Sequence, residues 1–229
     1  LPNAPAGAPN IVLVVLDTVR LPVLTASDGA LASLPNISKL ASQGVQFSQA
    51  IATSSWTLES HASLFSGLYA HHIFSGDETL LNFETPFPAG PPTLAEVLGR
   101  QGYLTGGFVA NTNYTSREHG LNRGFLHYDD YPLEGRDFVA SSGLGFKILE
   151  TVQRRLGRPT PIGQRNAAQV TRAFLDWFDE REPGRPVFAF LNYFDAHDPY
   201  VPETGFRTAP PIANPKINPY HLYAPDELA

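Results

Sequence analysis

Two apolar runs, each closed by an aspartate, constrain the fold of this 229-residue chain more than any other feature. Residues 11–16 form an unbroken aliphatic stretch followed by Asp17, and residues 186–194 form a second apolar stretch followed by Asp195. Runs of this length and character are typical of strands buried on both faces of a parallel sheet. The pattern predicts two such strands with an acidic residue at the carboxyl end of each.

Helical and strand-like patterns alternate between these two runs. Helices are expected at 35–41 with a stop at Gly44, at 60–66 with a stop at Gly67, at 92–102 and at 166–180. Further strands are expected at 45–52 and 103–110. This order predicts an α/β fold with a mostly parallel sheet and helices on both of its faces.

The segment 128–165 interrupts the alternation because it is rich in glycine, proline and charge and lacks a strand pattern. We interpret it as an irregular excursion that contains one helix near 146–156. No internal repeat is present, so residues 1–229 are interpreted as a single α/β domain.

The composition excludes several classes of protein. Hydrophobic residues make up 42% and charged residues 17%, which is ordinary for a globular domain. A net charge of −6 with three lysines argues against nucleic-acid binding, which requires clustered basic residues. No apolar run approaches the ~20 residues of a membrane span. The absence of cysteine excludes disulfides, thiolate metal ligands and a thiol nucleophile, and it leaves the compartment open, with bacterial cytoplasm and periplasm both compatible.

The ends of the chain predict that it is a piece of a longer protein. It contains no methionine and begins at Leu1. Residues 220–229 look like a loop that leads into a helix, with acids suited to its first turn. We therefore expect an α/β domain that is incomplete at its C-terminus.

The carboxyl ends of parallel strands are where ligands bind, so Asp17 is the first candidate site residue. A carboxylate at the end of a buried strand is costly unless it is hydrogen-bonded, paired or bound to a cation. A cap or turn role is the alternative for Asp17, and position alone does not decide between them.

Thr57 lies in the hydroxyl-rich segment 54–67, close to the start of a short expected helix. Its hydroxyl could simply be an N-cap, and spacing alone favours that role. The same geometry suits a nucleophile, because a helix N-terminus stabilises an alkoxide and holds a phosphate or sulfate. Ser54, Ser55 and Ser60 are competing hydroxyls.

His197 follows the second buried strand and is flanked by acids at Asp195 and Asp198. A histidine in this position could protonate a leaving group or contact an ester oxygen. A surface turn set by Asp198 and Pro199 is the equally weighted alternative.

Several blocks in this order resemble the sulfatase branch of the alkaline phosphatase superfamily. They are residues 9–20, 34–41, 44–47, 56–69, 93–110 and 188–202, so the resemblance covers nearly the whole chain except about 128–165. The family's nucleophile motif, Cys or Ser, any, Pro, Ser, Arg, two more, Leu, any, Thr, Gly, aligns with residues 57–67.

The resemblance implies a role for each candidate. Asp17 matches a metal ligand, Thr57 matches the nucleophile and a second ligand, and His197 matches the histidine that contacts the ester. Ser60, His61 and Asn111 fall in segments that the family uses for substrate binding. The cofactor implied is a divalent metal ion (Ca, Mg, Mn or Zn), and the substrate is an anionic ester on a small molecule, glycan or lipid.

Departures from the family pattern change the expected chemistry. Thr57 cannot be oxidised to the formylglycine aldehyde of sulfatases, and its plain alkoxide resembles the nucleophile of the family's phosphodiesterases and phosphotransferases. His61 replaces the motif arginine, residues 105–111 lack the lysine and histidine that sulfatases place nearby, and Thr18 stands where many members have a second aspartate. These differences favour a phosphate ester on chemistry, whereas the overall pattern favours a sulfatase.

The family takes its remaining metal ligands from a downstream Asp-His-Gly stretch that this chain lacks. Because a metal site needs three or more protein ligands, we expect the fragment itself to be inactive. The leading hypothesis is a metal-dependent hydrolase or transferase of sulfate or phosphate esters. A degenerate, non-catalytic member that binds an anionic ligand or a partner is the main alternative. An unrelated α/β binding domain would require all the ordered matches to be coincidental.

Overall fold

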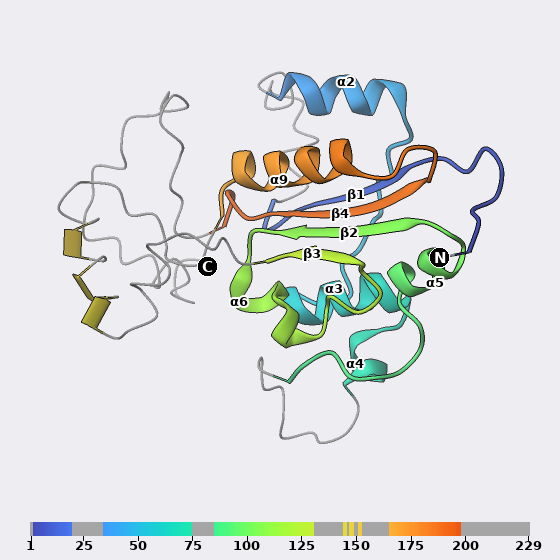
Figure 1. The fold of residues 1–229 in the computed structure, drawn as a ribbon. Coiled ribbons are helices and arrows are strands. Elements are labelled where there is room, and N and C mark those ends of the chain that lie inside the picture. Colours follow the sequence, from blue (N-terminus) through green and yellow to red (C-terminus); the bar gives the residue numbers. More distant parts are fainter. Residues whose placement is uncertain are drawn as a thin grey trace.

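The computed structural model describes residues 2–19, 34–74, 85–130, 144–145, 147–148, 151–152 and 165–197. One or more helices separate each strand from the next along these residues (Figure 1). The strands are β1 (Ile11–Leu16), β2 (Leu104–Val109), β3 (His127–Asp129) and β4 (Val187–Tyr193). The helices are α2 (Pro35–Gln43), α3 (Thr57–Ser66), α4 (Ala70–Ile73), α5 (Leu94–Arg100), α6 (Thr112–Thr115), the 3₁₀ turn η2 (Arg117–His119) and α9 (Ala167–Glu180).

The four strands form one parallel sheet in the order β1-β4-β2-β3. Strand β4 therefore lies between β1 and β2, so that Asn192 is level with Val15 on one side and Val109 on the other. Because all strands run the same way, their carboxyl ends meet at one edge of the sheet. The predicted α/β class with a parallel sheet is confirmed.

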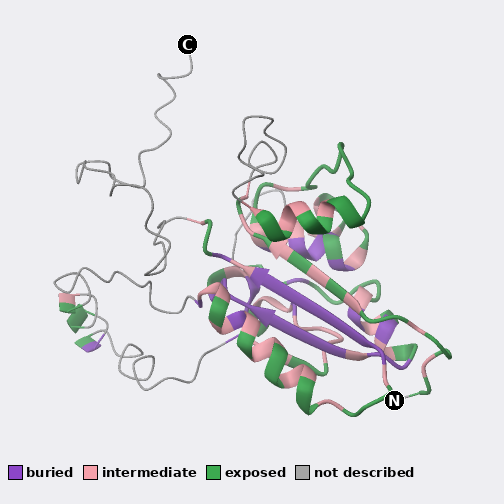
Figure 2. Cartoon of the chain, turned by 90° about the horizontal axis from the view of Figure 1, so that it is seen from above, coloured by how far each residue is buried: buried purple, intermediate pink, exposed green. Residues whose placement is uncertain are grey.

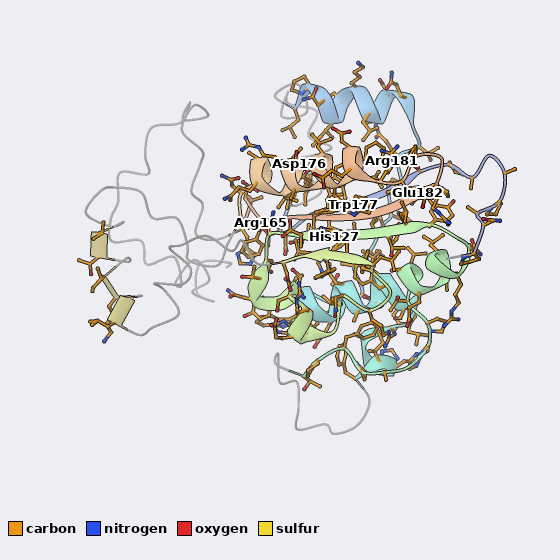
Figure 3. All side chains as sticks on the ribbon, viewed as in Figure 1. His127, Arg165, Asp176, Trp177, Arg181 and Glu182 are labelled. Atoms are coloured by element: carbon orange, nitrogen blue, oxygen red, sulfur yellow. The ribbon has the colours of Figure 1, made fainter. Side chains whose placement is uncertain are left out.

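Helix α9 covers one face of the sheet (Figure 1). Its capping box joins Asn166 and Gln169, and its apolar side packs on the sheet through Val170, Phe174 and Trp177. Trp177 lies on the α9 side of the sheet near His127, where the two rings stack with centroids 6.0 Å apart (Figure 3). Gly106 makes room for this indole, because a Cβ there would lie 2.9 Å from Trp177 Cη2.

Helices α3 and α5 cover the opposite face (Figure 1). Leu58, Ala62 and Phe65 of α3 pack against Val109 and Phe190 of the sheet. Ala95 and Leu98 of α5 pack against Phe188. Helices on both faces, as the sequence predicts, give the two central strands the buried surfaces seen in Figure 2.

Strand β1 differs from the prediction of a strand buried on both faces. Its residues alternate in burial, and Val12, Val14 and Leu16 are 49, 47 and 38% exposed. The reason is its position: β1 is an edge strand in the described part of the sheet, and α9 packs on β4 and β2. Ile11, Leu13 and Val15 point to the other face and contact the core there.

Two other expectations differ from the structure. Residues 45–52, predicted as a strand, form no regular element, and Val45, Phe47 and Ile51 are strongly exposed. An alternating pattern makes a strand only when a neighbouring strand pairs with it, and the described sheet provides none for this segment. Strand β3 overlaps the start of the segment 128–165 that was expected to be irregular.

Most of the excursion lies outside the described residues. The pairs 144–145, 147–148 and 151–152 are helical, and the rest of the helix expected near 146–156 falls on positions that are not described. Within the described ranges, no helix is both long enough and apolar enough to cross a bilayer.

Candidate functional site

The predicted site residue Asp17 lies at the carboxyl edge of the sheet, directly after β1. Its backbone N–H donates to the Tyr193 carbonyl at 2.9 Å, which continues the pairing of β1 with β4 by one residue. Asn111 follows β2 by two residues at the same edge, where it caps α6 by accepting from the Tyr114 N–H. The side-chain amide of Asn111 donates to Asp17 Oδ2 at 3.5 Å.

Thr57 is the first residue of α3, and Trp56 is the N-cap. The N-cap role that spacing favoured for Thr57 is therefore wrong: no side-chain hydrogen bond caps this helix. The Thr57 hydroxyl instead donates to Asp17 Oδ2 at 3.4 Å. One oxygen atom of Asp17 thus accepts two hydrogen bonds, one from a hydroxyl of α3 and one from the side-chain amide of Asn111 after β2.

His61 lies one turn further along α3, facing the sheet, and is 4% exposed. Its Nδ1 is 2.7 Å from the Thr57 carbonyl oxygen, and its ring packs edge-on against Phe65 and Phe190. Burial lowers the pKa of His61 below its usual value, against the opposing effects of the Thr57 hydrogen bond and the Asp17 charge. The ring therefore favours the neutral form at neutral pH.

The second ring nitrogen of His61 meets Asn192 on the central strand. Asn192 Nδ2 lies 3.4 Å from His61 Nε2, and Asn192 Oδ1 accepts from the Asn111 backbone N–H at 3.2 Å. Asn192 is fully buried. Because protein groups hold both ring nitrogens, direct contact of His61 with a substrate would require one of these bonds to break.

His197 lies at the same edge, after β4. Its ring stacks on Phe194 with centroids 4.1 Å apart, and its backbone N–H donates to the Phe194 carbonyl at 3.0 Å. The preceding residue, Ala196, accepts from the Thr18 hydroxyl at 2.8 Å. Thr18 has a φ of +60°, so a strained residue joins the loop after Asp17 to the loop that carries His197.

Ser54, Ser60 and Asp195 form bonds that do not involve the Asp17–Thr57 pair. Ser54 donates to Glu59 at 2.6 Å, which turns both side chains toward each other. Ser60 lies in the first turn of α3, where its backbone N–H bonds the Trp56 carbonyl. Asp195 accepts from the Ala167 N–H at the start of α9. Asp17 and Thr57 are thus brought together, whereas the carboxylate of Asp195 bonds the first residue of α9.

The donor atoms at Asp17 suit a hard cation. Adjacent oxygen ligands in an octahedral shell with metal–oxygen distances of about 2.1 to 2.4 Å lie roughly 3.0 to 3.4 Å apart, and Thr57 Oγ1 and Asp17 Oδ2 are separated by 3.4 Å. The set is small: the described ranges contain no group of three or more His, Cys, Asp or Glu residues able to hold a metal ion. The oxygens of Asp17 and Thr57 could therefore be two ligands of such an ion, and the ion would need further ligands.

The sequence prediction missed Asn192. The available signal was an asparagine inside the apolar run 186–194, because a buried amide must find hydrogen-bond partners. Its partners could not be read from that run, since His61 lies 131 positions away and Asn111 lies 81 positions away.

Comparison with known proteins identifies the family. The family model described as sulfatase matches residues 9–216. The chain belongs to the sulfatase family. The resemblance found in the sequence blocks is thereby confirmed.

Individual relatives of this sulfatase-family chain carry sulfatase names. It is 31% identical to arylsulfatase H of Homo sapiens over 140 residues, and this alignment covers 54% of the chain and 25% of the relative. It is 33% identical to N-acetylgalactosamine-6-O-sulfatase of Bacteroides thetaiotaomicron over 98 residues, and this alignment covers 43% of the chain and 19% of the relative. The aligned part is thus about a quarter of these relatives' length or less.

Solved structures share the fold. The phosphonate monoester hydrolase of Agrobacterium radiobacter matches with a TM-score of 0.55 at 21% identity, over 81% of this chain and 40% of that one. The structure of Ps i-CgsB in complex with k-i-k-neocarrahexaose matches with a TM-score of 0.57 at 22% identity, over 85% and 47% of the two chains. These similarities support the α/β architecture described above.

Proposed function

We propose that this sulfatase-family chain carries the nucleophile of a metal-dependent site that hydrolyses or transfers a sulfate or phosphate ester. Thr57 is the nucleophile in this proposal. The observation that carries it is the 3.4 Å approach of Thr57 Oγ1 to Asp17 Oδ2, at the edge of the sheet where all strands end.

The position of Thr57 suits attack on an anionic ester. The first residues of α3 have backbone N–H groups without partners inside the helix, and the dipole is positive at this end. An ester anion bound here would be stabilised by those N–H groups. Asp17 accepts a hydrogen bond from the Thr57 hydroxyl, so the carboxylate also orients the attacking oxygen.

We propose a divalent cation as cofactor, held by Asp17 and Thr57 together with further ligands. Such an ion lowers the pKa of a coordinated hydroxyl and neutralises charge on ester oxygens. The identity of the ion stays open among Ca, Mg, Mn and Zn, because oxygen donors alone do not select one of them.

Asn111 and His197 have supporting roles in this proposal. Asn111 donates to the oxygen of Asp17 that also receives the Thr57 hydroxyl, so its amide orients the carboxylate. His197 protonates the leaving oxygen of the ester. Its position supports this role, because the carbonyl of the adjacent Ala196 accepts from the hydroxyl of Thr18, the residue that follows Asp17. Ser60, in the first turn of α3, completes the proposed contacts with the ester.

The two ester classes are supported by different observations. Membership of the sulfatase family and the sulfatase names of the relatives favour a sulfate ester. Threonine at position 57 favours a phosphate ester, because its secondary alcohol cannot yield an aldehyde. The substrate is an anionic ester in either case.

The test is an assay of the protein from its complete reading frame with Mg²⁺, Ca²⁺, Mn²⁺ or Zn²⁺. Aryl sulfate, aryl phosphate and a phosphodiester are the substrates. We expect turnover of at least one ester and a loss of about a thousandfold or more in Thr57→Ala. Ser54→Ala, which removes a neighbouring hydroxyl bonded to Glu59, should keep most of the activity. Full activity in Thr57→Ala would exclude Thr57 as the nucleophile.

A non-catalytic, anion-binding member is the second candidate. It is favoured by the neutral, buried His61 at the position of the motif arginine, where both ring nitrogens bond protein atoms. Binding of sulfate or phosphate without turnover of any ester, in the complete protein with metal, would establish this second function over the first.

A further inference from the structure

Five residues of the site form a closed hydrogen-bonded circuit through their side chains and two backbone groups. Starting from Asn111, its backbone N–H donates to Asn192, Asn192 contacts His61, and His61 contacts the Thr57 carbonyl. The side chains of Thr57 and Asn111 both donate hydrogen bonds to Asp17, which closes the circuit. The circuit joins α3 to the ends of β1, β2 and β4.

Two backbone groups fix the direction of every hydrogen bond in the buried part of this circuit. The Thr57 carbonyl can only accept, so His61 Nδ1 carries the hydrogen, and the neutral ring leaves Nε2 as an acceptor. At the other end, the Asn111 N–H can only donate, so the Asn192 oxygen faces it and the Asn192 NH₂ faces His61. The amide orientation and the histidine tautomer required by the two ends agree.

We propose that Asn192 is a positioning residue for Thr57, acting through the Nδ1–H tautomer of His61. The inference rests on the proposed role of Thr57 as nucleophile. The amide of Asn192 lies on the most enclosed strand of the described sheet, level with Val15 and Val109, so it is the rigid member of the circuit. By donating to Nε2 it holds the proton on Nδ1, and Nδ1–H in turn holds the first turn of α3.

A second asparagine bonds the same strand outside this circuit. Asn10 also bonds β4, accepting from the Val187 N–H at 3.0 Å, but at the opposite end of the strand. Asn10 therefore provides a matched control: it is an asparagine that anchors the same strand with one hydrogen bond far from the circuit.

The experiment compares Asn192→Leu, Asn192→Asp and Asn10→Ala in the protein from its complete reading frame. Leucine keeps the number and branching of the side-chain heavy atoms, is somewhat bulkier, and removes both side-chain bonds. Aspartate keeps the oxygen that faces Asn111 and replaces the donor to His61 by an acceptor. If one of the two variants does not fold, the other provides the test, and thermal unfolding establishes which are folded.

The first readout is the ring ¹⁵N spectrum of His61, assigned by its loss in His61→Phe. We expect a protonated Nδ1 and an unprotonated, hydrogen-bonded Nε2 in the wild type, an Nε2 resonance shifted by loss of its hydrogen bond in Asn192→Leu, and a proton on Nε2 in Asn192→Asp. Asn10→Ala should leave the wild-type spectrum unchanged. An Nε2–H tautomer in the wild type, an unshifted Nε2 resonance in Asn192→Leu, or an Nδ1–H tautomer retained in Asn192→Asp would overturn the proposal.

The second readout is steady-state kinetics on the ester that the protein turns over. We expect kcat to fall about 10- to 100-fold in both Asn192 variants with KM nearly unchanged, as for groups that orient a reacting residue. An equal fall in Asn10→Ala, or a wild-type kcat in both Asn192 variants, would reduce Asn192 to a structural residue. If no ester is turned over, the proposed function fails, whereas the tautomer spectra still decide the hydrogen-bond chain.

Discussion

The hydroxyl of Thr57 donates to Asp17 at 3.4 Å, although forty positions separate the two residues in the sequence. The first comes from the start of α3 and the second from the end of β1. They meet because α3 packs on the face of the sheet toward which Leu13 and Val15 point. Alternation along β1 places Asp17 on that same face. A hydroxyl at the positive end of a helix beside a carboxylate is the arrangement on which the proposed chemistry depends.

Asp17→Asn should weaken divalent metal binding more than any other strand-end substitution. The amide keeps the shape of the side chain and removes its negative charge, which is a main determinant of affinity for hard cations. We expect the affinity to fall about 100-fold or more, because even residues that only orient metal ligands contribute 10- to 100-fold. Isothermal titration of the complete protein with each of the four ions measures the change.

The control for this substitution is Asp195→Asn. Asp195 also follows a strand, but its carboxylate accepts from the Ala167 N–H at the start of α9. We expect Asp195→Asn to change stability only slightly, because asparagine keeps an oxygen that can accept from the Ala167 N–H. Metal affinity should stay within about threefold, because the Asp195 carboxylate bonds the start of α9 and not the Asp17–Thr57 pair. Equal losses of affinity in both variants would contradict a metal site at Asp17.

Gly106→Ala should destabilise the domain by about 1 to 3 kcal/mol. A Cβ at this position would lie 2.9 Å from Trp177 Cη2 and 3.0 Å from Phe108 Cε2, so one of these rings must shift. Urea unfolding measures the change. Gly99→Ala is the control, because nothing lies within 4 Å of its Cβ and α5 should gain up to about 1 kcal/mol from the helix propensity of alanine.

A double-mutant cycle separates crowding from a loss of strand flexibility. If Trp177 is the group that Gly106→Ala displaces, then Trp177→Phe should remove most of the penalty, and the two substitutions should be coupled by about 1 kcal/mol or more. Strict additivity of the two free energies would show that the glycine is required for another reason.

Much of the fold follows from local sequence patterns. The helix over Ala167–Glu180 is predicted by its apolar periodicity and begins at the asparagine cap, while β2 and β4 occupy the apolar runs assigned to them. These elements are specified by residues close together in the chain. The ordered family blocks also placed Asp17 and Thr57 in one site, which periodicity alone could not do.

The differences arise where the outcome depends on distant neighbours. Residues 45–52 have the alternation of a strand but no described partner, and β1 has apolar residues on both faces but helical cover on one. Thr57 is the first residue of α3 because the helix begins three residues earlier than the apolar pattern indicated. The pairing of Asn192 with His61 required the packing of α3 beneath β4 to be known.

Arg117→Ala should destabilise the domain at neutral pH by leaving Asp130 without its main partner. The Asp130 side chain is 1% exposed and forms a bidentate pair with the Arg117 guanidinium, with a shortest distance of 2.8 Å. Burial alone would raise the pKa of Asp130, and the hydrogen bonds and charge of Arg117 outweigh it and hold that pKa below its usual value. Because the guanidinium is largely exposed, we expect a loss of about 1 to 2 kcal/mol.

The pH dependence of this loss has a definite sign. In the wild type the folded pKa of Asp130 is depressed, so its contribution is present above the unfolded value of about 3.9 and is lost as the pH falls through the folded value. In Arg117→Ala the backbone N–H of residue 117 still donates to Asp130, but the guanidinium bonds and charge are lost, so the pKa of Asp130 rises from its wild-type value. Protonation of Asp130 therefore relieves part of the loss, and the difference in unfolding free energy between variant and wild type narrows on acidification. Urea unfolding at pH 7, 5 and 3.5 measures it. Arg185→Ala, which breaks a pair with the exposed Glu182 and a hydrogen bond to the Pro2 carbonyl, should lose no more than about 1 kcal/mol, and this loss should not depend on Asp130. If the loss of unfolding free energy in Arg117→Ala is the same at pH 7 and pH 3.5, the guanidinium acts through packing and not through the charge of Asp130.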